Sequence, residues 1–381
     1  MKILFASHTH MRGAYVVGSH HLANTLAEKG HRVAHFSSPI SVFHLTRWWS
    51  DERVRERFRA WYEGIATTET GAYEGVPLSV IPGKANIRYF PSTNVMMKLM
   101  LPSLKDILRR IGMAKLDAVF IDQPSYFNIW RHIPVDKVVY RPTDVYDKIH
   151  DLTSLDQVEQ IILDRADGLV ATSQPVLKHL LAKRPSTPPA RVISNGVEYD
   201  HFRGSTEPPP EYEHIEKPRA VYVGAIDERF DWDLIVEAAL KSPDIQFVLI
   251  GRTSPGTAIG RGPDNVHVLG ERPYEKLPSY LQHGSVGLLP TNQHEANEGR
   301  SPMKVYEYMA SGLEVVARRT AELERRTSPP MHLYDTPDEF IRQINSCVRR
   351  SGTQSSKCRS RARKESWDTK ADEVIGFVKG L

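Results

Sequence analysis

The chain has 381 residues, enough for two domains that each bury a core of their own. Its formal net charge of +4 is too small to indicate a nucleic-acid partner, but it favours anionic ligands or anionic membrane surfaces. Two cysteines, Cys347 and Cys358, exclude a disulfide framework and a four-cysteine zinc site, so we expect a reducing, cytoplasmic setting. No apolar run of about 18 residues occurs, which argues against a spanning helix and a signal peptide.

The first predicted elements are a strand at residues 2–6, a loop with His8 and His10, and a helix over 19–29. Strand, loop and helix in this order predict a doubly wound α/β domain. The glycines of the loop lack the spacing of a dinucleotide fingerprint, so NAD binding is set aside. Both histidines follow the carboxyl end of a strand, where such sheets bind ligands, and we expect contact with a substrate rather than a metal.

Two basic segments rich in aromatic or methionine side chains follow, at residues 42–59 and 88–110. A segment of this kind either lies in a membrane interface or packs its apolar side into a domain core. The methionine-rich run of the second segment, flanked by cations, favours membrane contact there.

Strand patterns resume at residues 116–122 and 137–144, and each ends on a carboxylate, Asp122 and Asp144 respectively. Carboxylates at strand ends point into the crevice of an open α/β sheet, where they act on a ligand, or else they cap the following helix.

The first half closes with a strand at 167–173 and the segment 190–202, which contains an Asn195-Gly196 turn. Residues 204–218 hold four prolines and four glutamates, a composition typical of a linker. The second half repeats the alternation, with strands expected over 219–226, 245–251, 265–272, 285–290 and 313–317, and helices over 233–242, 337–350 and 367–378.

The stretch 298–318 combines several signals. Ser301 stands where a helix N-cap belongs, Lys304 and Glu307 share one helix face, and Gly312 ends the helix before a buried strand. Free backbone N–H groups at such a helix start suit a phosphate. The alternative is an ordinary helix, turn and strand with a surface Lys–Glu pair.

Three segments resemble signatures of the glycosyltransferases of the B fold: residues 301–317 with Pro-x-Lys-x-x-Glu-Tyr, residues 166–173, and residues 193–202. The resemblance implies an α/β fold of two Rossmann-like domains that face each other across a cleft. Residues 1–203 would bind the acceptor and residues 204–365 a nucleotide sugar, with the C-terminal helix 366–381 packing back on the first domain.

A narrower resemblance rests on SHTHMRG in the first loop, the two basic segments, and RPTDVY at a strand end. These are similar to the membrane-associated glucuronosyltransferases of xanthan-type exopolysaccharide synthesis. The resemblance implies inverting transfer of glucuronate from UDP-glucuronate to a polyprenyl-diphosphate oligosaccharide, at the inner face of the cell membrane. It implies no metal and no cofactor.

The same resemblance assigns donor-binding roles. Without a metal, the leaving diphosphate must be met by positive side chains and backbone N–H groups. The implied set is Lys304, Ser301 and the Met303 backbone for the diphosphate, Glu307 for the ribose, Glu271 and Arg272 for the uracil, Arg229 for the diphosphate from a second loop, and Asn292 for the donor sugar.

Inversion needs a general base for the acceptor hydroxyl, and Asp144 is the first candidate, with Asp122 as its rival. A retaining enzyme would need no such base, and His8 or His10 would then carry more weight. Two further readings remain open: a sugar-nucleotide epimerase of the same fold, and a non-catalytic lectin-like or membrane-binding scaffold.

Overall fold

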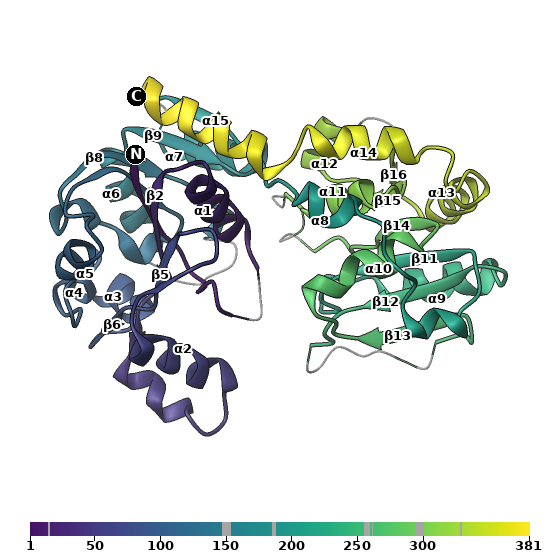
Figure 1. Ribbon diagram of the computed structural model, residues 1–381, viewed down its shortest axis with the longest axis horizontal. Coiled ribbons are helices and arrows are strands. Elements are labelled where there is room, and N and C mark those ends of the chain that lie inside the picture. Colours follow the sequence, from purple (N-terminus) through teal and green to yellow (C-terminus); the bar gives the residue numbers. More distant parts are fainter. Residues whose placement is uncertain are drawn as a thin grey trace. The chain divides into compact units, whose positions relative to one another are not determined.

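The computed structural model describes residues 1–13, 16–146, 154–184, 188–254, 260, 262–294, 297, 301–327 and 330–381. Within them the chain forms two compact units, Met1–Ser194 with Lys370–Leu381, and Asn195–Thr369 (Figure 1). Each unit is built around its own parallel sheet, so the predicted α/β fold with two Rossmann-like domains is confirmed.

The main sheet of the first unit has the strand order β10-β9-β8-β7-β1-β2-β5-β4, in which only the β4–β5 pair is antiparallel among the described pairs. A two-stranded sheet pairs β3 with β6. The strands are β1 (Lys2–Ala6), β2 (Arg32–Phe36), β3 (Ile40–Ser41), β4 (Ala66–Thr67), β5 (Tyr73–Gly75), β6 (Leu78–Ser79), β7 (Leu116–Ile121), β8 (Val135–Tyr140), β9 (Gly168–Ala171) and β10 (Ala190–Val192). The helices are α1 (Gly18–Glu28), α2 (Glu52–Glu63), α3 (Gly83–Tyr89), α4 (Val95–Lys98), α5 (Leu104–Arg110), α6 (Leu155–Arg165) and α7 (Gln174–Lys183).

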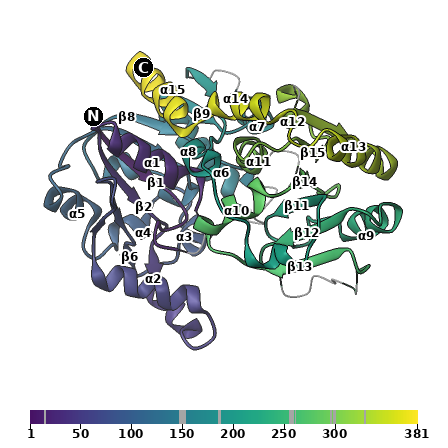
Figure 2. The ribbon, with the colours of Figure 1, turned by 45° about the vertical axis from the view of Figure 1, so that its right-hand side comes forward.

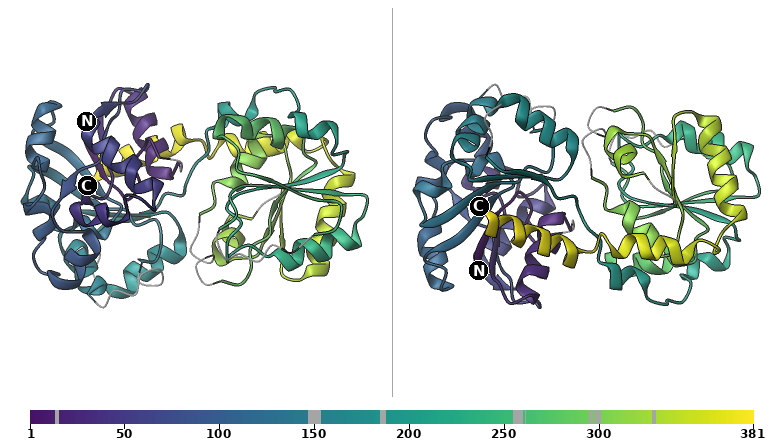
Figure 3. Two further views of the ribbon diagram at one scale, coloured as in Figure 1. Left: turned by 90° about the horizontal axis from the view of Figure 1, so that it is seen from below. Right: turned by 90° about the horizontal axis from the view of Figure 1, so that it is seen from above.

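The sheet of the second unit has the order β13-β12-β11-β14-β15-β16, and all its pairs are parallel. Helices cover both faces of this sheet (Figure 3). Its strands are β11 (Arg219–Val223), β12 (Gln246–Ile250), β13 (Val266–Gly270), β14 (Val286–Leu289), β15 (Val315–Arg318) and β16 (Met331–Tyr334). Its helices are α8 (Tyr199–Arg203), α9 (Trp232–Lys241), α10 (Leu277–Gln282), α11 (Lys304–Ala310), α12 (Ala321–Arg326), α13 (Pro337–Arg349) and α14 (Ser355–Arg363).

The last helix, α15 (Trp367–Gly380), begins in the second unit and ends in the first. Its C-terminal part runs along β8 and β9 (Figures 1 and 2), where Lys137 Nζ donates to the carbonyl of Leu381 at 2.6 Å. Helix α8, which the sequence division at residue 203 places in the first domain, packs against α10 and α11 in the second unit.

The first basic segment packs part of its apolar side chains into a core, which is one of its two predicted alternatives, and membrane contact stays a prediction. Its helix α2 buries Val54 and Phe58 in a small apolar cluster, whereas Phe43 and Trp49 before the helix are 61% and 89% exposed. In this segment the chain therefore packs one side and presents large apolar side chains on the other.

The methionine-based argument for membrane contact in the second basic segment is wrong. Met96, Met97 and Met100 are buried in the main core of the first unit, with exposures of 0%, 3% and 2%. Flexible methionine side chains fill irregular gaps beneath a sheet as readily as they meet lipid, and periodicity does not distinguish the two. No helix among the described residues is long and apolar enough to cross a membrane.

Two glycines meet where β11 and β12 end. A Cβ on Gly251, which has φ +150°, would lie 1.8 Å from the carbonyl oxygen of Gly224, a backbone atom. We expect Gly251→Ala to lower the free energy of unfolding by about 3 kcal/mol, because the backbone has to shift to admit the methyl group. Urea titration measures the loss. Gly204→Ala is the matched control, since a Cβ there meets nothing within 4 Å, and equal stability of the two variants would contradict the prediction.

Candidate active site

In the first unit the chain order reverses between β1 and β7, and ligands of open α/β sheets bind at the carboxyl ends of the strands beside such a point. The backbone continues the sheet there, because the N–H of Asp122 donates to the carbonyl of Ala6 at 3.0 Å and that of Arg141 to Ile121 at 2.9 Å. This register brings together the residues that follow β1, β7 and β8.

A buried ion pair forms the floor of this region. Arg141 donates to the Asp122 carboxylate at 2.9 Å, and both side chains are almost fully buried. Burial raises the pKa of Asp122 to about 6, although Arg141 and the Ser7 hydroxyl act in the opposite direction. Asp122 is thus committed to Arg141, a partner that the sequence analysis did not single out, although a charged residue directly after an apolar strand was its signal.

Asp144 follows the same strand as Arg141 and is only partly buried. Its Oδ2 accepts a hydrogen bond from Thr143 Oγ1 at 3.0 Å, and the Thr143 carbonyl is held by Thr172 at 2.9 Å. The pKa of His8 is lowered, chiefly because the surrounding protein displaces water from the ring. The Arg141 guanidinium adds to the lowering, and the Asp144 carboxylate opposes it. The His8 side chain is exposed to solvent. Asp144 and His8 therefore form the solvent-accessible part of this group, and Asp122 forms its buried part.

His10 belongs to a different environment from His8. Burial and the guanidinium groups of Arg57 and Arg12 lower its pKa to about 4. His20, bonded to Thr9, has its pKa lowered to about 3, chiefly by burial. Both predicted histidines lie close enough to act on His20, but different charges act on them: Asp144 and Arg141 on His8, and Arg57 and Arg12 on His10.

The buried histidines make the first unit sensitive to acid. A histidine whose pKa is lower in the folded than in the unfolded state is stabilising above pH 6.5, and that stability is lost as the pH falls towards the folded value. Asp122, with its raised pKa, acts in the opposite sense between pH 3.8 and about 6. Because His10, His20 and the fully buried His35 outnumber it, we expect the free energy of unfolding to fall from pH 6.5 to 4.

Urea denaturation across this pH range checks the expectation. His20→Gln should flatten the dependence, since the unfolded chain then takes up one proton fewer. His214→Gln, which changes an exposed histidine of the second unit, should leave the dependence as in the wild type. Identical slopes for the wild type and His20→Gln would contradict the assignment.

In the second unit the chain order reverses between β11 and β14. The loop after β11 begins with Gly224, and a Cβ there would lie 2.9 Å from Lys304 Cε. The lysine stem therefore lies against the carboxyl end of β11. Helix α11 is fixed in this position by Tyr308, whose hydroxyl accepts from the Val223 N–H at 2.8 Å. Lys304 thus reaches the place where the fold provides a ligand site.

Ser301 does not cap α11, contrary to the sequence prediction: the helix begins at Lys304, and Met303 is its N-cap residue. The buried Ser301 instead accepts hydrogen bonds on Oγ from the Asn195 N–H at 3.2 Å and from Arg326 at 3.0 Å. The Asn195 side chain also donates to the Ser301 carbonyl at 3.1 Å. No turn is assigned at Asn195-Gly196, contrary to the sequence prediction, and Asn195 instead joins its segment to the stretch before Lys304. The prediction that Gly312 ends the helix is confirmed, as Gly312 follows the C-cap residue with φ +94°.

Glu307 is 6% exposed and has Tyr274 as a neighbour. Burial raises the pKa of Tyr274, and the carboxylates of Glu307 and Glu198 raise it further. The Tyr274 ring stacks on His201 with centroids 4.8 Å apart. Sequence reasoning missed Glu198 and Tyr274, which come from separate segments and meet only through folding.

The remaining predicted donor residues are divided between two loops. Arg229 pairs with Asp227, which raises the pKa of Arg229, and its carbonyl accepts from the Asn292 N–H at 2.9 Å. The structure thus brings Arg229 and Asn292 together. Arg272 donates to Glu211 at 2.8 Å and to the Tyr280 hydroxyl at 2.9 Å, and Glu271 beside it is exposed.

Comparisons with known proteins divide the chain in the same way. Residues 5–172 match the family model "Glucuronosyltransferase GumK, N-terminal domain", and residues 217–350 match "Glycosyl transferases group 1". TuaH of Bacillus subtilis strain 168, named as a teichuronic acid biosynthesis glycosyltransferase, is 26% identical over 233 residues. That alignment covers 57% of this chain and 58% of TuaH, so the chain spans less than two thirds of this relative.

Solved structures show the fold. Sucrose-phosphate synthase of Thermosynechococcus elongatus superposes with a TM-score of 0.71 at 16% identity, covering 100% of this chain and 98% of that one. HepE of Anabaena in complex with UDP superposes with a TM-score of 0.67 at 14% identity, and both chains are covered fully. The two-unit architecture is therefore that of the B-fold glycosyltransferases.

Proposed function

We propose that the chain, which matches glycosyltransferase family models over residues 5–172 and 217–350 and has the B fold, transfers glucuronate from UDP-glucuronate to a polyprenyl-diphosphate-linked oligosaccharide. The observation that carries the proposal is the match of residues 5–172 to the glucuronosyltransferase N-terminal domain. The group of His8, Asp122, Arg141 and Asp144 lies wholly within that match. Transfer to a lipid-linked acceptor would place the protein in the synthesis of an exopolysaccharide.

In this proposal the second unit holds the donor. Lys304, lying against the loop after β11, neutralises charge that develops on the diphosphate as the glycosidic bond breaks. Ser301, held by Asn195 and Arg326, and the Met303 backbone fix the approach to Lys304. The buried Glu307 accepts from the ribose hydroxyls. The likeness to the UDP complex of HepE supports a uridine nucleotide, and the transfer needs no metal.

The other predicted donor residues have smaller roles in donor binding. Arg229 and Asn292 come from loops that bond to each other, so they would shape the sugar end of the site together. Glu271 and Arg272 stand after β13, where they would face the uracil. The Arg272 guanidinium is already engaged by Glu211 and Tyr280, so its part is to hold this loop in place.

The first unit would supply the acceptor side. Inversion requires a base that removes the acceptor proton as the new bond forms. Asp144 is partly exposed and accepts from Thr143, whereas Asp122 is fully buried and paired with Arg141. We therefore assign proton removal to Asp144, positioning of this loop to Asp122, and contact with the acceptor to His8. His10 lies near Arg57 and Arg12, where it would line a more distant part of the acceptor site.

A lipid-linked acceptor also calls for access to a membrane. The segment Val42–Glu63 exposes Phe43, Trp49 and Tyr62 by 61%, 89% and 86%, together with exposed arginines that include Arg53. Aromatic side chains among cations bind the interface of anionic membranes. We propose peripheral attachment through this segment at the cytoplasmic face of the cell membrane.

Sedimentation with vesicles tests the attachment. Wild-type protein should bind vesicles that contain anionic lipid, and salt should weaken the binding. The affinity of the double variant Phe43→Ser, Trp49→Ser for the vesicles should be lower by at least about tenfold, because two large apolar side chains are no longer transferred from water into the membrane. Leu240→Ser, which removes a 67% exposed side chain on α9, should bind as the wild type does. Equal binding of the double variant would exclude this segment.

A donor screen tests the activity. Purified protein is incubated with a mannose-terminated polyprenyl-diphosphate oligosaccharide and, in turn, UDP-glucuronate, UDP-glucose and UDP-galactose. Elongated lipid product is expected with UDP-glucuronate only. Product with another sugar nucleotide alone would change the donor, and isomerised nucleotide sugar in the absence of acceptor would indicate an epimerase. No product together with no thermal stabilisation by UDP would favour a non-catalytic scaffold.

A retaining transferase is the second candidate, favoured by one structural relative. A trehalose-6-phosphate synthase whose structure is described as bearing on glycosyl transfer with retention superposes with a TM-score of 0.62. The anomeric configuration of the product, read by nuclear magnetic resonance, separates the two candidates. Retention would remove the need for Asp144 as a base.

A further inference from the structure

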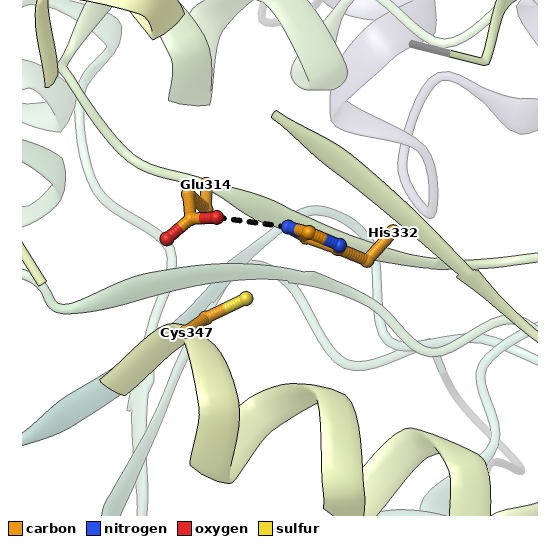
Figure 4. Close-up of side chains that lie close together, drawn as sticks. All are labelled: Glu314, His332 and Cys347. Carbon is orange, nitrogen blue, oxygen red and sulfur yellow. Dashed lines mark hydrogen bonds and ion pairs between the residues drawn. The ribbon is translucent and has the colours of Figure 1, made fainter. Parts of the chain in front are cut away.

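Three side chains of different chemistry converge inside the second unit, away from the proposed donor site. Glu314, His332 and Cys347 each offer one ligand atom, and these atoms all lie within 4.8 Å of one another. Figure 4 shows the three side chains pointing toward a common space. From this convergence we propose that the unit binds a thiophilic divalent cation, of which Zn²⁺ is the type, with these residues as its protein ligands.

The sheet and the helix packed on it determine this geometry. Glu314 directly precedes β15, and its carbonyl accepts from the Gly287 N–H of β14 at 2.9 Å. His332 stands in β16, paired in register with Val316 of β15. Cys347 comes from the last turns of α13, which packs against β15 and β16. The ligands therefore sit on core elements, which hold a metal site more firmly than surface loops do.

One oxygen of the group has no hydrogen-bond partner within the described part of the chain. Glu314 is 6% exposed, and its Oε1 lies 2.8 Å from His332 Nε2 and 3.1 Å from the Arg350 guanidinium. Its Oε2 is buried and accepts no hydrogen bond from any residue that the structure describes. A buried carboxylate oxygen left without a partner costs free energy, which a bound cation would recover.

The donor set selects the kind of cation. Thiolate, imidazole and carboxylate together suit Zn²⁺ or Co²⁺, whereas Mg²⁺ and Ca²⁺ prefer oxygen ligands alone. Zinc bonds of about 2.0–2.3 Å place tetrahedral ligand atoms about 3–4 Å apart, so a contraction on the order of 1 Å closes the site. Cys347 would bind as the thiolate and release its proton to solvent, and water would take the fourth position.

Arg350 is the internal competitor of the cation. Its guanidinium contacts Glu314 and comes within 3.8 Å of Cys347 Sγ, and its side chain is 40% exposed. A cation bound between Glu314 and Cys347 would repel the nearby Arg350 guanidinium, so the charge of Arg350 opposes binding of the cation. This competition gives a test with opposite signs for two substitutions in the same cluster.

The location of the site indicates that the cation has a structural role. Glu314 and His332 lie at the amino ends of their strands, whereas Gly224 and Asn292 follow the carboxyl ends of β11 and β14. The cation would therefore link β15, β16 and α13 without touching the sugar nucleotide. The proposal is independent of the proposed activity and compatible with metal-free transfer.

Cobalt spectroscopy on the full-length protein, freed of metal with a chelator, tests the proposal. One Co²⁺ per chain should bind and give a thiolate-to-metal charge-transfer band, which Zn²⁺ then displaces. Cys347→Ser should lose the band, and His332→Gln should weaken binding about tenfold or more. Arg350→Gln should tighten binding. Zn²⁺ should raise the melting temperature of the wild type but not of Cys347→Ser.

The matched control is His267→Gln, on β13 at the other edge of the sheet. This variant should retain the band. If Cys347→Ser does not fold, Glu314→Gln replaces it as the ligand variant, with weakened binding expected. Absence of the band from the wild type, its persistence in Cys347→Ser, or weaker binding in Arg350→Gln would overturn the proposal.

Discussion

Replacing Asp144 by asparagine is expected to lower kcat by about 10²- to 10⁴-fold, the range that one positioned general base contributes. The amide keeps the size of the side chain and still accepts from Thr143, but it removes no proton from the acceptor. Because the donor is proposed to bind to the other unit, the affinity for UDP should stay within about twofold of the wild type, since no contact to the nucleotide changes. Steady-state kinetics measures the change in kcat, and calorimetry with UDP measures the affinity for the nucleotide.

Asp136→Asn provides the matched control. Asp136 stands near the amino end of β8, whereas Asp144 follows the carboxyl end of the same strand, and Asp136 is half exposed beside Lys115. Its replacement should leave kcat unchanged. A fully active Asp144→Asn variant would remove Asp144 as the base, and a loss of activity matched by loss of folding would assign it a structural role instead.

Replacing Lys304 by alanine should weaken UDP binding about 10- to 100-fold, because a hydrogen bond to a charged group contributes about 1.5–3 kcal/mol. The Lys304 stem lies against Gly224 at the end of β11, so its ammonium group is placed to meet a diphosphate bound at that strand end. Calorimetric titrations with UDP and with uridine show whether the loss of affinity depends on the phosphates. Binding of UDP should fall, and binding of uridine, which has no phosphate, should not.

Lys241→Ala is the control for removing a positive charge. Lys241 is 50% exposed on α9 and pairs with Glu237, so its loss should leave UDP affinity unchanged. Lys304→Arg should recover part of the affinity, since it restores the charge but not the shape. If Lys304→Ala binds UDP as tightly as the wild type does, the diphosphate is held elsewhere.

The expected effects of Asp144→Asn and Lys304→Ala have one structural origin. In each unit the proposed site lies where the chain order of the sheet reverses, beside the first strand of that unit. Asp144 follows β8, which pairs with β7, and Lys304 begins α11, which packs against β14 and β15. Substitutions at these positions should therefore act on transfer, whereas Gly251→Ala should act on the stability of the second unit.

Local patterns in the sequence were sufficient to predict most elements. Apolar runs of strand length predicted β1, β7, β11, β12 and β14, and the helix predicted from Pro337 has a complete capping box at Thr336 and Glu339. These signals depend on residues adjacent in the chain, so they survive without knowledge of the fold. The methionine run failed as a signal because burial depends on the partner surface, which the run itself does not contain.

The sequence by itself determined the α/β class, the two-unit organisation, the placement of Asp122 and Asp144 after strands and that of Lys304 in the first turn of a helix, because hydrophobic periodicity and the polarity of element ends are local properties. Only the tertiary structure decided that Arg141 neutralises Asp122, that Asn195 holds Ser301, and that Cys347 meets Glu314 and His332. Each of these pairings joins side chains from different elements, and their distance is set by the register of strands and the packing of helices, which no single segment encodes.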